Sequence, residues 1–301
     1  MLDFGKMFFS GLLVRKAQSL IVIQKVCSNG LYAKALKLLI KIRNHNTLFD
    51  IDDAEHFRQE TLSYHFFLKN CQKISVGSQA LREYCLQYNN HVFVQTSPVC
   101  DHGVKKVKRD EVLHIGWVGD FGNGNAVSQG FSHKASLYSL LFPQLRTITN
   151  PIKLSLIGIK NANDIPEIRA YFLDCPNIEL HIPRNLDWEV DHWVYPLIAS
   201  FDVGVSPMLD HPFNQAKSAF KAKQYLSCDV PVIASDVGEN NQFVQDGING
   251  VLCKNPDDFG KAICRFSKMS NEEYKSFRKS TTLRREAYAL HTYSNRLIGC
   301  F

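Results

Sequence analysis

Three polar residues in the second half of the chain are spaced as one face of a helix. Lys217, Lys221 and Gln224 lie at positions i, i+4 and i+7 of a helix expected at 215–227, with Asn214 as its N-cap. Two ammonium groups near the positive end of a helix would offset the charge of a bound diphosphate and stabilise it as a leaving group. A solvated amphipathic face explains the same spacing, so both interpretations stay open.

A second candidate site follows in the stretch 230–253. Its sequence predicts a buried strand, a turn at Gly238, and a short helix capped by Asn240 or by the next residue, also an asparagine. Glu239 and the backbone of this turn could form hydrogen bonds with sugar hydroxyls. A plain strand–turn–helix unit is the alternative, because the Asp-Gly and Asn-Gly pairs nearby are common turn dipeptides.

A glycine-rich loop follows the strand predicted at 113–118. Gly119 and Asp120 open this loop, and His133 and Lys134 stand where the next helix should begin. Glycines let the backbone approach a ligand closely, and the start of a helix offers free N–H groups to an anion. The spacing is not GxGxxG, which argues against a standard dinucleotide fingerprint. A surface loop without a ligand is the other interpretation.

Clustered carboxylates form the fourth candidate site. Asp52 and Asp53 follow a short predicted strand at 48–51, where they could orient an acceptor hydroxyl, act as a base or bind a metal. They are equally good N-caps for a helix starting at Ala54.

The nine cysteines show no CxxC or Cys/His metal spacing, so we expect reduced thiols, no zinc site and a cytosolic protein.

Short β-rich runs alternate with helical patterns along the whole chain, which predicts parallel sheets with right-handed crossovers. We therefore expect two doubly wound α/β domains, at 1–97 and 113–301, joined by a polar linker at 98–112. The C-terminal helix could pack back on the first domain. Ligands bind such sheets at the carboxyl ends of the strands. The expected strands are 19–24, 48–51, 74–76, 91–95, 113–118, 152–157, 178–181, 202–206 and 230–234, and the expected helices include 31–43, 134–147, 165–172, 188–199 and a region from 256 to 290.

Charge is unevenly distributed over the 301 residues. Residues 1–112 hold 16 Lys and Arg against 10 Asp and Glu, which accounts for the whole net charge of +6. A basic part of this kind could contact an anionic membrane surface or an acidic ligand, although an ordinary solvated surface is the simpler interpretation. No nucleic-acid-binding motif accompanies it. The sequence predicts no signal peptide and no transmembrane helix.

Taken together, these motifs resemble a GT-B glycosyltransferase, most closely the retaining family 4 type (glycosyl transferases group 1). The stretch 217–252 resembles the donor-site block of that family, IGWVGD at 115–120 resembles the opening of its nucleotide-sugar domain, and FDVGVSPM at 201–208 resembles the strand before its donor helix. The first domain matches more loosely, through FDIDD and ISVGS. It also looks shortened, by one or two strand–helix units.

The resemblance implies metal-independent transfer, without a cofactor, from a nucleotide-diphosphate sugar to a glycan or lipid-linked acceptor in polysaccharide or glycoconjugate synthesis. The enzyme would be cytoplasmic, with a possible place at the inner face of a membrane. Catalytic roles would fall to the residues Asp52, Asp53, Lys217 and Lys221, and donor binding to Gly119, Asp120, Lys134, Arg184, Gln224, Gly238, Glu239 and Asn240.

Three positions depart from the family pattern. Glutamates are expected at 216, 224 and 242, where this chain has Ala216, Gln224 and Gln242. Glutamine can form a hydrogen bond with a hydroxyl but cannot act as a carboxylate. An NDP-sugar epimerase, a sugar phosphorylase, and a non-catalytic sugar-nucleotide-binding subunit of a split enzyme with a partner subunit therefore remain alternatives.

Overall fold

The computed structural model describes residues 19–24, 30–43, 46–57, 62–121, 130–183, 186 and 190–299. These residues form two compact units. The described residues within 1–98, 216–218 and 290–301 belong to the first unit, and those within 99–215 and 219–289 belong to the second. Each unit contains one parallel sheet with helices, which confirms the predicted α/β class.

The first unit has a four-stranded sheet in the order β1-β2-β3-β4. Along the chain its elements are β1 (Ile21–Gln24), α2 (Leu31–Arg43), β2 (Thr47–Ile51), the 3-10 turn η2 (Glu55–Phe57), α3 (Leu62–Asn70), β3 (Lys73–Val76), α4 (Gln79–Cys85), β4 (Val92–Val94) and α14 (Leu290–Ile298). Ser78 caps α4, since its hydroxyl accepts a hydrogen bond from the Leu81 N–H at 3.2 Å.

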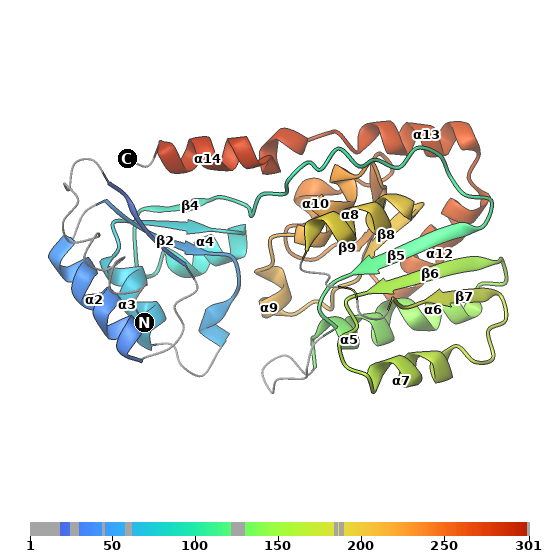
Figure 1. Cartoon of the computed structure of the whole chain (residues 1–301), viewed down its shortest axis with the longest axis horizontal. Coiled ribbons are helices and arrows are strands. Elements are labelled where there is room, and N and C mark those ends of the chain that lie inside the picture. Colours follow the sequence, from blue (N-terminus) through green and yellow to red (C-terminus); the bar gives the residue numbers. More distant parts are fainter. Residues whose placement is uncertain are drawn as a thin grey trace. The chain divides into compact units, whose positions relative to one another are not determined.

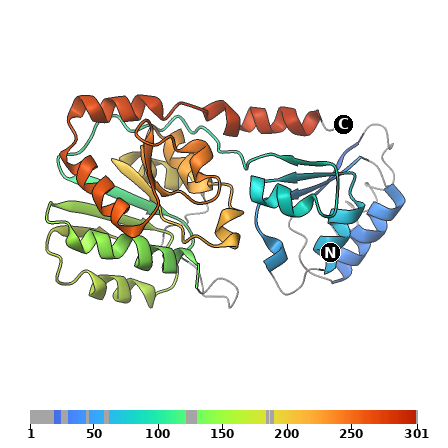
Figure 2. The ribbon, with the colours of Figure 1, turned by 180° about the vertical axis from the view of Figure 1, so that it is seen from behind.

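The two faces of this sheet carry different helices. Phe49 of β2 is buried against Tyr64 and Phe67 of α3, with ring centroids 5.7 and 5.5 Å away. Successive strand residues point to opposite faces, so Asp50 faces the other way. There its carboxylate accepts a hydrogen bond from the hydroxyl of Tyr293 on α14 at 3.2 Å. Figures 1 and 2 show α14 on the side of this sheet away from α2 and α3.

The second unit has a six-stranded parallel sheet in the order β10-β9-β8-β5-β6-β7. Its elements are β5 (Leu113–Val118), α5 (His133–Ser136), the π-turn η3 (Leu137–Leu141), α6 (Phe142–Thr147), β6 (Ile152–Ile157), α7 (Asp164–Tyr171), β7 (Ile178–His181), α8 (Asp191–Ser200), β8 (Val203–Ser206), α9 (Pro212–Gln215), α10 (Phe220–Ser227), β9 (Val232–Ser235), α11 (Asn240–Phe243), β10 (Gly250–Cys253), α12 (Pro256–Lys268), α13 (Asn271–Ser280) and the 3-10 turn η4 (Arg285–Tyr288).

Alternation along β5 divides the core of this unit into two layers. Trp117 belongs to a buried cluster with side chains of α6, α7 and α12, such as Phe142 and Ile263. Its neighbour Val118 belongs to a second cluster, with Tyr195 of α8 and Tyr225 of α10. Helices therefore cover both faces of the sheet, as in a doubly wound fold (Figure 1).

The structure differs from the sequence predictions in several elements. The expected helix at 134–147 contains the π-turn η3 between α5 and α6. The terminal helical region divides at Met269, because Ser270 and Glu273 form a capping box that starts α13. Strand β10 was not predicted, since it begins at Gly250 and its pairing with β9 defines it.

The basic run at 105–109 is bound within the second unit. Lys106 is 5% exposed, and its ammonium lies 3.0 Å from the Asp202 carboxylate. The Lys105 ammonium donates to the Ser227 carbonyl at 2.5 Å, and the Arg109 guanidinium donates to the Ser267 carbonyl at 2.7 Å. These cations thus hold the predicted linker against its own unit. Among the described residues, no helix combines the length and the apolar character needed to cross a bilayer.

Candidate functional site

The strand order of the second unit marks where a ligand should bind. From β5 the sheet extends through β6 to β7 on one side and through β8 to β9 and β10 on the other. Such a topological switch point opens a crevice outside the carboxyl ends of the two central strands. Here these strands are β5, which ends at Val118, and β8, which ends at Ser206. Gly119 and Asp120 therefore lie at the expected position.

Backbone packing positions Gly119. Its N–H donates to the Ile157 carbonyl at 3.0 Å, which ties the exit of β5 to that of β6. Gly158 has φ +102°, and a Cβ atom there would lie 2.0 Å from the Gly119 carbonyl oxygen. Only glycine fits at 158, and this close approach fixes the peptide at the end of β5.

Lys221 lies beside this peptide. A Cβ atom on Gly119 would be 3.6 Å from the Lys221 side-chain Cδ. The Lys221 ammonium is 2.8 Å from His133 Nε2, and His133 Nδ1 is 2.8 Å from the Asp120 carbonyl oxygen. A carbonyl only accepts, so His133 Nδ1 carries the proton and Nε2 accepts from the ammonium. The fold thus brings together Gly119, Asp120, His133 and Lys221.

The predicted single helix through 215–227 is wrong. Helix α9 ends at Gln215 and α10 begins at Phe220, because Ala219 adopts the left-handed conformation with φ 55°. Asn214 lies inside α9, where its amide donates to the Leu209 carbonyl at 2.9 Å, and so it does not cap the helix. Lys217 therefore shares no helical stripe with Lys221.

Lys217 belongs to the first unit together with Asp53. Its ammonium is 3.5 Å from the Asp53 carboxylate. The neighbouring Ala216 carbonyl accepts from the Ser78 hydroxyl at 2.8 Å, which holds the segment in place. The helix expected from Ala54 is only the turn η2, and its Glu55 N–H donates to the Asp53 backbone carbonyl at 2.8 Å. The predicted acceptor carboxylate Asp53 is thus already paired with a predicted catalytic lysine.

Two neighbouring residues of α10 are buried. Gln224 is 8% exposed, and its side chain lies within hydrogen-bond reach of the Tyr195 hydroxyl. Lys223, which the sequence analysis did not single out, has no exposed surface, and its ammonium lies 5.2 Å from the Phe243 ring centroid. Burial lowers the pKa of Lys223 to about 7, and the nearby charge of Glu239 opposes this shift.

The turn after β9 is held from two sides. The Gly238 N–H donates to the Gln215 side-chain oxygen at 2.9 Å, and the Asn240 amide donates to the Ser235 carbonyl at 3.0 Å. Asn240 is the first residue of α11 and does not cap it, which corrects the prediction. Its buried Oδ1 has no hydrogen-bond partner among the described residues. Glu239 lies in the same turn and is 9% exposed.

Lys134 is directed toward α7. Its ammonium lies 2.9 Å from the Asp164 carboxylate and 2.6 Å from that of Glu167. Two carboxylates therefore already compensate its charge. Arg184, the remaining predicted donor residue, lies outside the described residues.

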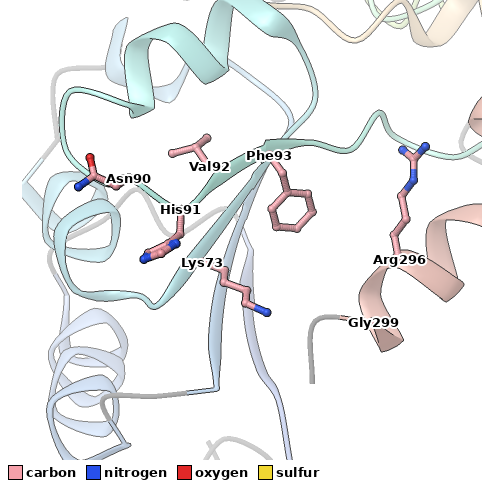
Figure 3. Close-up of a pocket in the computed structure, with 7 residues that line it drawn as sticks. All are labelled: Lys73, Asn90, His91, Val92, Phe93, Arg296 and Gly299. Carbon is pink, nitrogen blue, oxygen red and sulfur yellow. The ribbon is translucent and has the colours of Figure 1, made fainter.

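A cavity of about 410 Å³ lies in the first unit, away from all predicted site residues. Figure 3 shows Lys73, Phe93 and their neighbours on one side of it and Arg296 and Gly299 on the other. Lys73 and Val92 are the first residues of β3 and β4, so this cavity lies at the amino ends of the strands. Because parallel sheets bind ligands at the opposite edge, we place the functional site at the switch point of the second unit.

Known proteins resemble this chain in sequence and in fold. Residues 131–268 match the family described as glycosyl transferases group 1. No curated protein matches the sequence significantly. This family match covers the motifs at 201–208 and 217–252 and confirms the resemblance predicted from them.

Solved structures share the fold. TarM of S. aureus has a TM-score of 0.67 at 13% identity, over 97% of this chain and 57% of TarM. HepE of Anabaena, solved with UDP-glucose, has a TM-score of 0.67 at 13% identity, over 98% of this chain and 80% of HepE. Sucrose-phosphate synthase from Thermosynechococcus elongatus has a TM-score of 0.70 at 16% identity, over 98% of this chain and 76% of the synthase. The chain thus spans little more than half of the length of TarM, and the GT-B type of fold is confirmed.

Proposed function

We propose that this chain, whose residues 131–268 match the group 1 glycosyltransferases, transfers a sugar from a nucleotide-diphosphate sugar to a glycan or lipid-linked acceptor. The observation that carries the proposal is the cluster of Lys221, His133 and Gly119 at the switch point of the second sheet. The complex of HepE with UDP-glucose supports a donor of this class on the same fold.

Lys221 is the proposed stabiliser of the leaving group. When the bond between the anomeric carbon and the diphosphate breaks, negative charge develops on the departing phosphate oxygen. The Lys221 ammonium lies 2.8 Å from His133 Nε2 and its side chain lies beside the Gly119 peptide, so its positive charge can offset the charge that develops on the diphosphate. His133 directs the ammonium toward the Gly119 peptide, where a phosphate can approach the backbone closely.

The remaining roles follow from position. We propose that Glu239 and the free oxygen of Asn240 contact sugar hydroxyls, because both lie in the turn at the carboxyl end of β9. Asp52 and Asp53 of the first unit are the proposed acceptor-side carboxylates, with Lys217 as the cation paired with Asp53. We further propose that transfer retains the anomeric configuration, serves glycan synthesis, and takes place in the cytoplasm or at the inner face of a membrane.

The test compares Lys221→Ala with Lys261→Ala, a change at an exposed lysine of α12. A thermal-shift screen over UDP-, GDP- and ADP-sugars first identifies the donor, since a ligand that binds only the native state raises the melting temperature. Release of nucleotide is then measured with and without acceptor. We expect Lys221→Ala to lower kcat by about 100- to 1000-fold, the usual effect of removing one transition-state donor. Lys261→Ala should remain active.

Two results would contradict the proposal. Unchanged turnover of Lys221→Ala would remove Lys221 from the reaction. Donor binding by the wild-type chain without turnover on any acceptor would favour a sugar-nucleotide-binding subunit, in line with Ala216 and Gln224 at positions where the family has glutamates.

A further inference from the structure

Three side chains that can ligate metals meet in the second unit, outside the proposed donor site. Cys100, His102 and Asp191 each offer one ligand atom, and these atoms lie within 4.8 Å of one another. His102 Nε2 is 3.0 Å from the Asp191 carboxylate. Because the sequence separates His102 from Asp191 by 89 positions, no metal-binding spacing is visible in the chain itself.

The backbone on both sides of this cluster is held in place. The Val99 N–H donates to the Tyr288 carbonyl at 2.9 Å, directly before Cys100. The Asp101 carboxylate accepts from the Gly103 N–H at 2.8 Å, which fixes the turn that carries His102. Asp191 is the first residue of the ten-residue helix α8.

Helix α8 also supports the imidazole. The buried Tyr195, one turn after Asp191, packs its ring 4.2 Å from the His102 ring. The three ligands therefore come from two anchored segments. Cys100 is half-buried and the other two residues are exposed, so an ion can enter from solvent.

We propose that Cys100, His102 and Asp191 bind a divalent transition-metal ion, with Zn²⁺ as the best match. A thiolate, a neutral imidazole and a carboxylate are the common zinc ligands, at about 2.0 to 2.3 Å from the ion. The thiolate and carboxylate together balance the charge of Zn²⁺, and water completes a tetrahedron. The thiolate disfavours Mg²⁺ and Ca²⁺, which prefer oxygen ligands. The ion would join the segment after Val99 to the start of α8, and this structural role does not depend on the proposed transferase activity.

The full-length reduced chain is titrated with Co²⁺ and Zn²⁺ alone. We expect about one tightly bound Co²⁺ per chain, with an intense thiolate-to-cobalt absorption band in the near ultraviolet. Cys100→Ser should abolish this band and weaken Zn²⁺ binding by at least about 100-fold, more than the loss of an outer-shell partner causes. Cys264→Ser changes another half-buried thiol, on α12, and should keep both properties.

A second variant keeps the test decisive if Cys100→Ser does not fold. Asp191→Asn keeps the thiol and the side-chain size, so the band should persist while Zn²⁺ affinity falls by at least about 10-fold. His192→Gln, at the adjacent exposed residue of α8, should bind as wild type does. The proposal is overturned if wild type shows no thiolate band, if Cys264→Ser loses it as Cys100→Ser does, or if Asp191→Asn binds Zn²⁺ as tightly as wild type.

Discussion

Replacing Lys223 by methionine tests whether the second unit buries a lysine that titrates near neutral pH. Lys223 has no exposed surface, and its ammonium lies near the rings of Phe243 and Phe220. Burial lowers its pKa from 10.5 to about 7, against the opposing effect of Glu239. Methionine keeps an unbranched chain of similar length and removes the charge.

The direction in which the free energy of unfolding changes with pH follows from the difference in proton binding between the native and the unfolded chain. Below about pH 7 the lysine is charged in both the native and the unfolded chain, so the native state bears the full cost of burying it. Between the lowered pKa of about 7 and the unfolded pKa of 10.5, the native lysine is neutral while the unfolded lysine still binds a proton. The free energy of unfolding of wild type therefore rises with pH across this window. Above 10.5 this contribution is constant.

The size of this change in the free energy of unfolding comes from the same two pKa values. Their difference corresponds to about 5 kcal/mol over the whole window, at about 1.36 kcal/mol per tenfold change in proton affinity. Between about pH 6.5 and about pH 9.5 the linkage expression gives about 3 kcal/mol. The difference in the free energy of unfolding at any single pH also contains the loss of the attraction between Lys223 and Glu239. Its change with pH is therefore the quantity to measure.

Urea unfolding of wild type and Lys223→Met at about pH 6.5 and about pH 9.5 measures how the stability difference between them changes with pH. We expect wild type to gain about 3 kcal/mol relative to the variant as the pH rises. Lys275→Met, at an exposed lysine of α13, is the matched control and should show no such change. If Lys223→Met behaves like Lys275→Met, then Lys223 is solvated and the reasoning is refuted.

Two further predictions concern the backbone around the site. Tyr225→Phe removes the buried hydroxyl that accepts from the Val118 N–H at 2.9 Å, and we expect a loss of about 1 to 3 kcal/mol in urea unfolding; wild-type stability would show that this N–H finds another partner. Gly158→Ala places a Cβ atom 2.0 Å from the Gly119 carbonyl at φ +102°, so the melting temperature should fall with a loss of at least about 1 to 3 kcal/mol, and donor-induced thermal shifts should shrink. An alanine variant with wild-type melting and donor binding would contradict the close approach.

Local patterns in the sequence were sufficient to predict most of the strands and helices. Strands β5 and β6 occupy the predicted ranges 113–118 and 152–157, because their apolar runs are long enough to identify a buried strand without knowing its neighbours. The motifs at 115–120 and 217–252 were also sufficient to indicate the group 1 glycosyltransferase family. The local sequence did not predict strand β10, since four residues beginning with glycine become a strand only by pairing with β9.

The candidate site depended on tertiary structure in a different way. Helical spacing placed Lys217 and Lys221 on one stripe, but the left-handed backbone at Ala219 separates them, and propensity does not predict this conformation for alanine. The pairing of Lys221 with His133 joins residues 88 positions apart.

What the sequence determined by itself is the order of strands and helices, the α/β class and the family resemblance, because these depend on residues near one another in the chain. Only the tertiary structure decided which lysine reaches the end of β5, that Lys223 is buried, and that Cys100 and His102 meet Asp191. Burial and close approach depend on contacts between distant segments, and those contacts exist only once the sheet has formed.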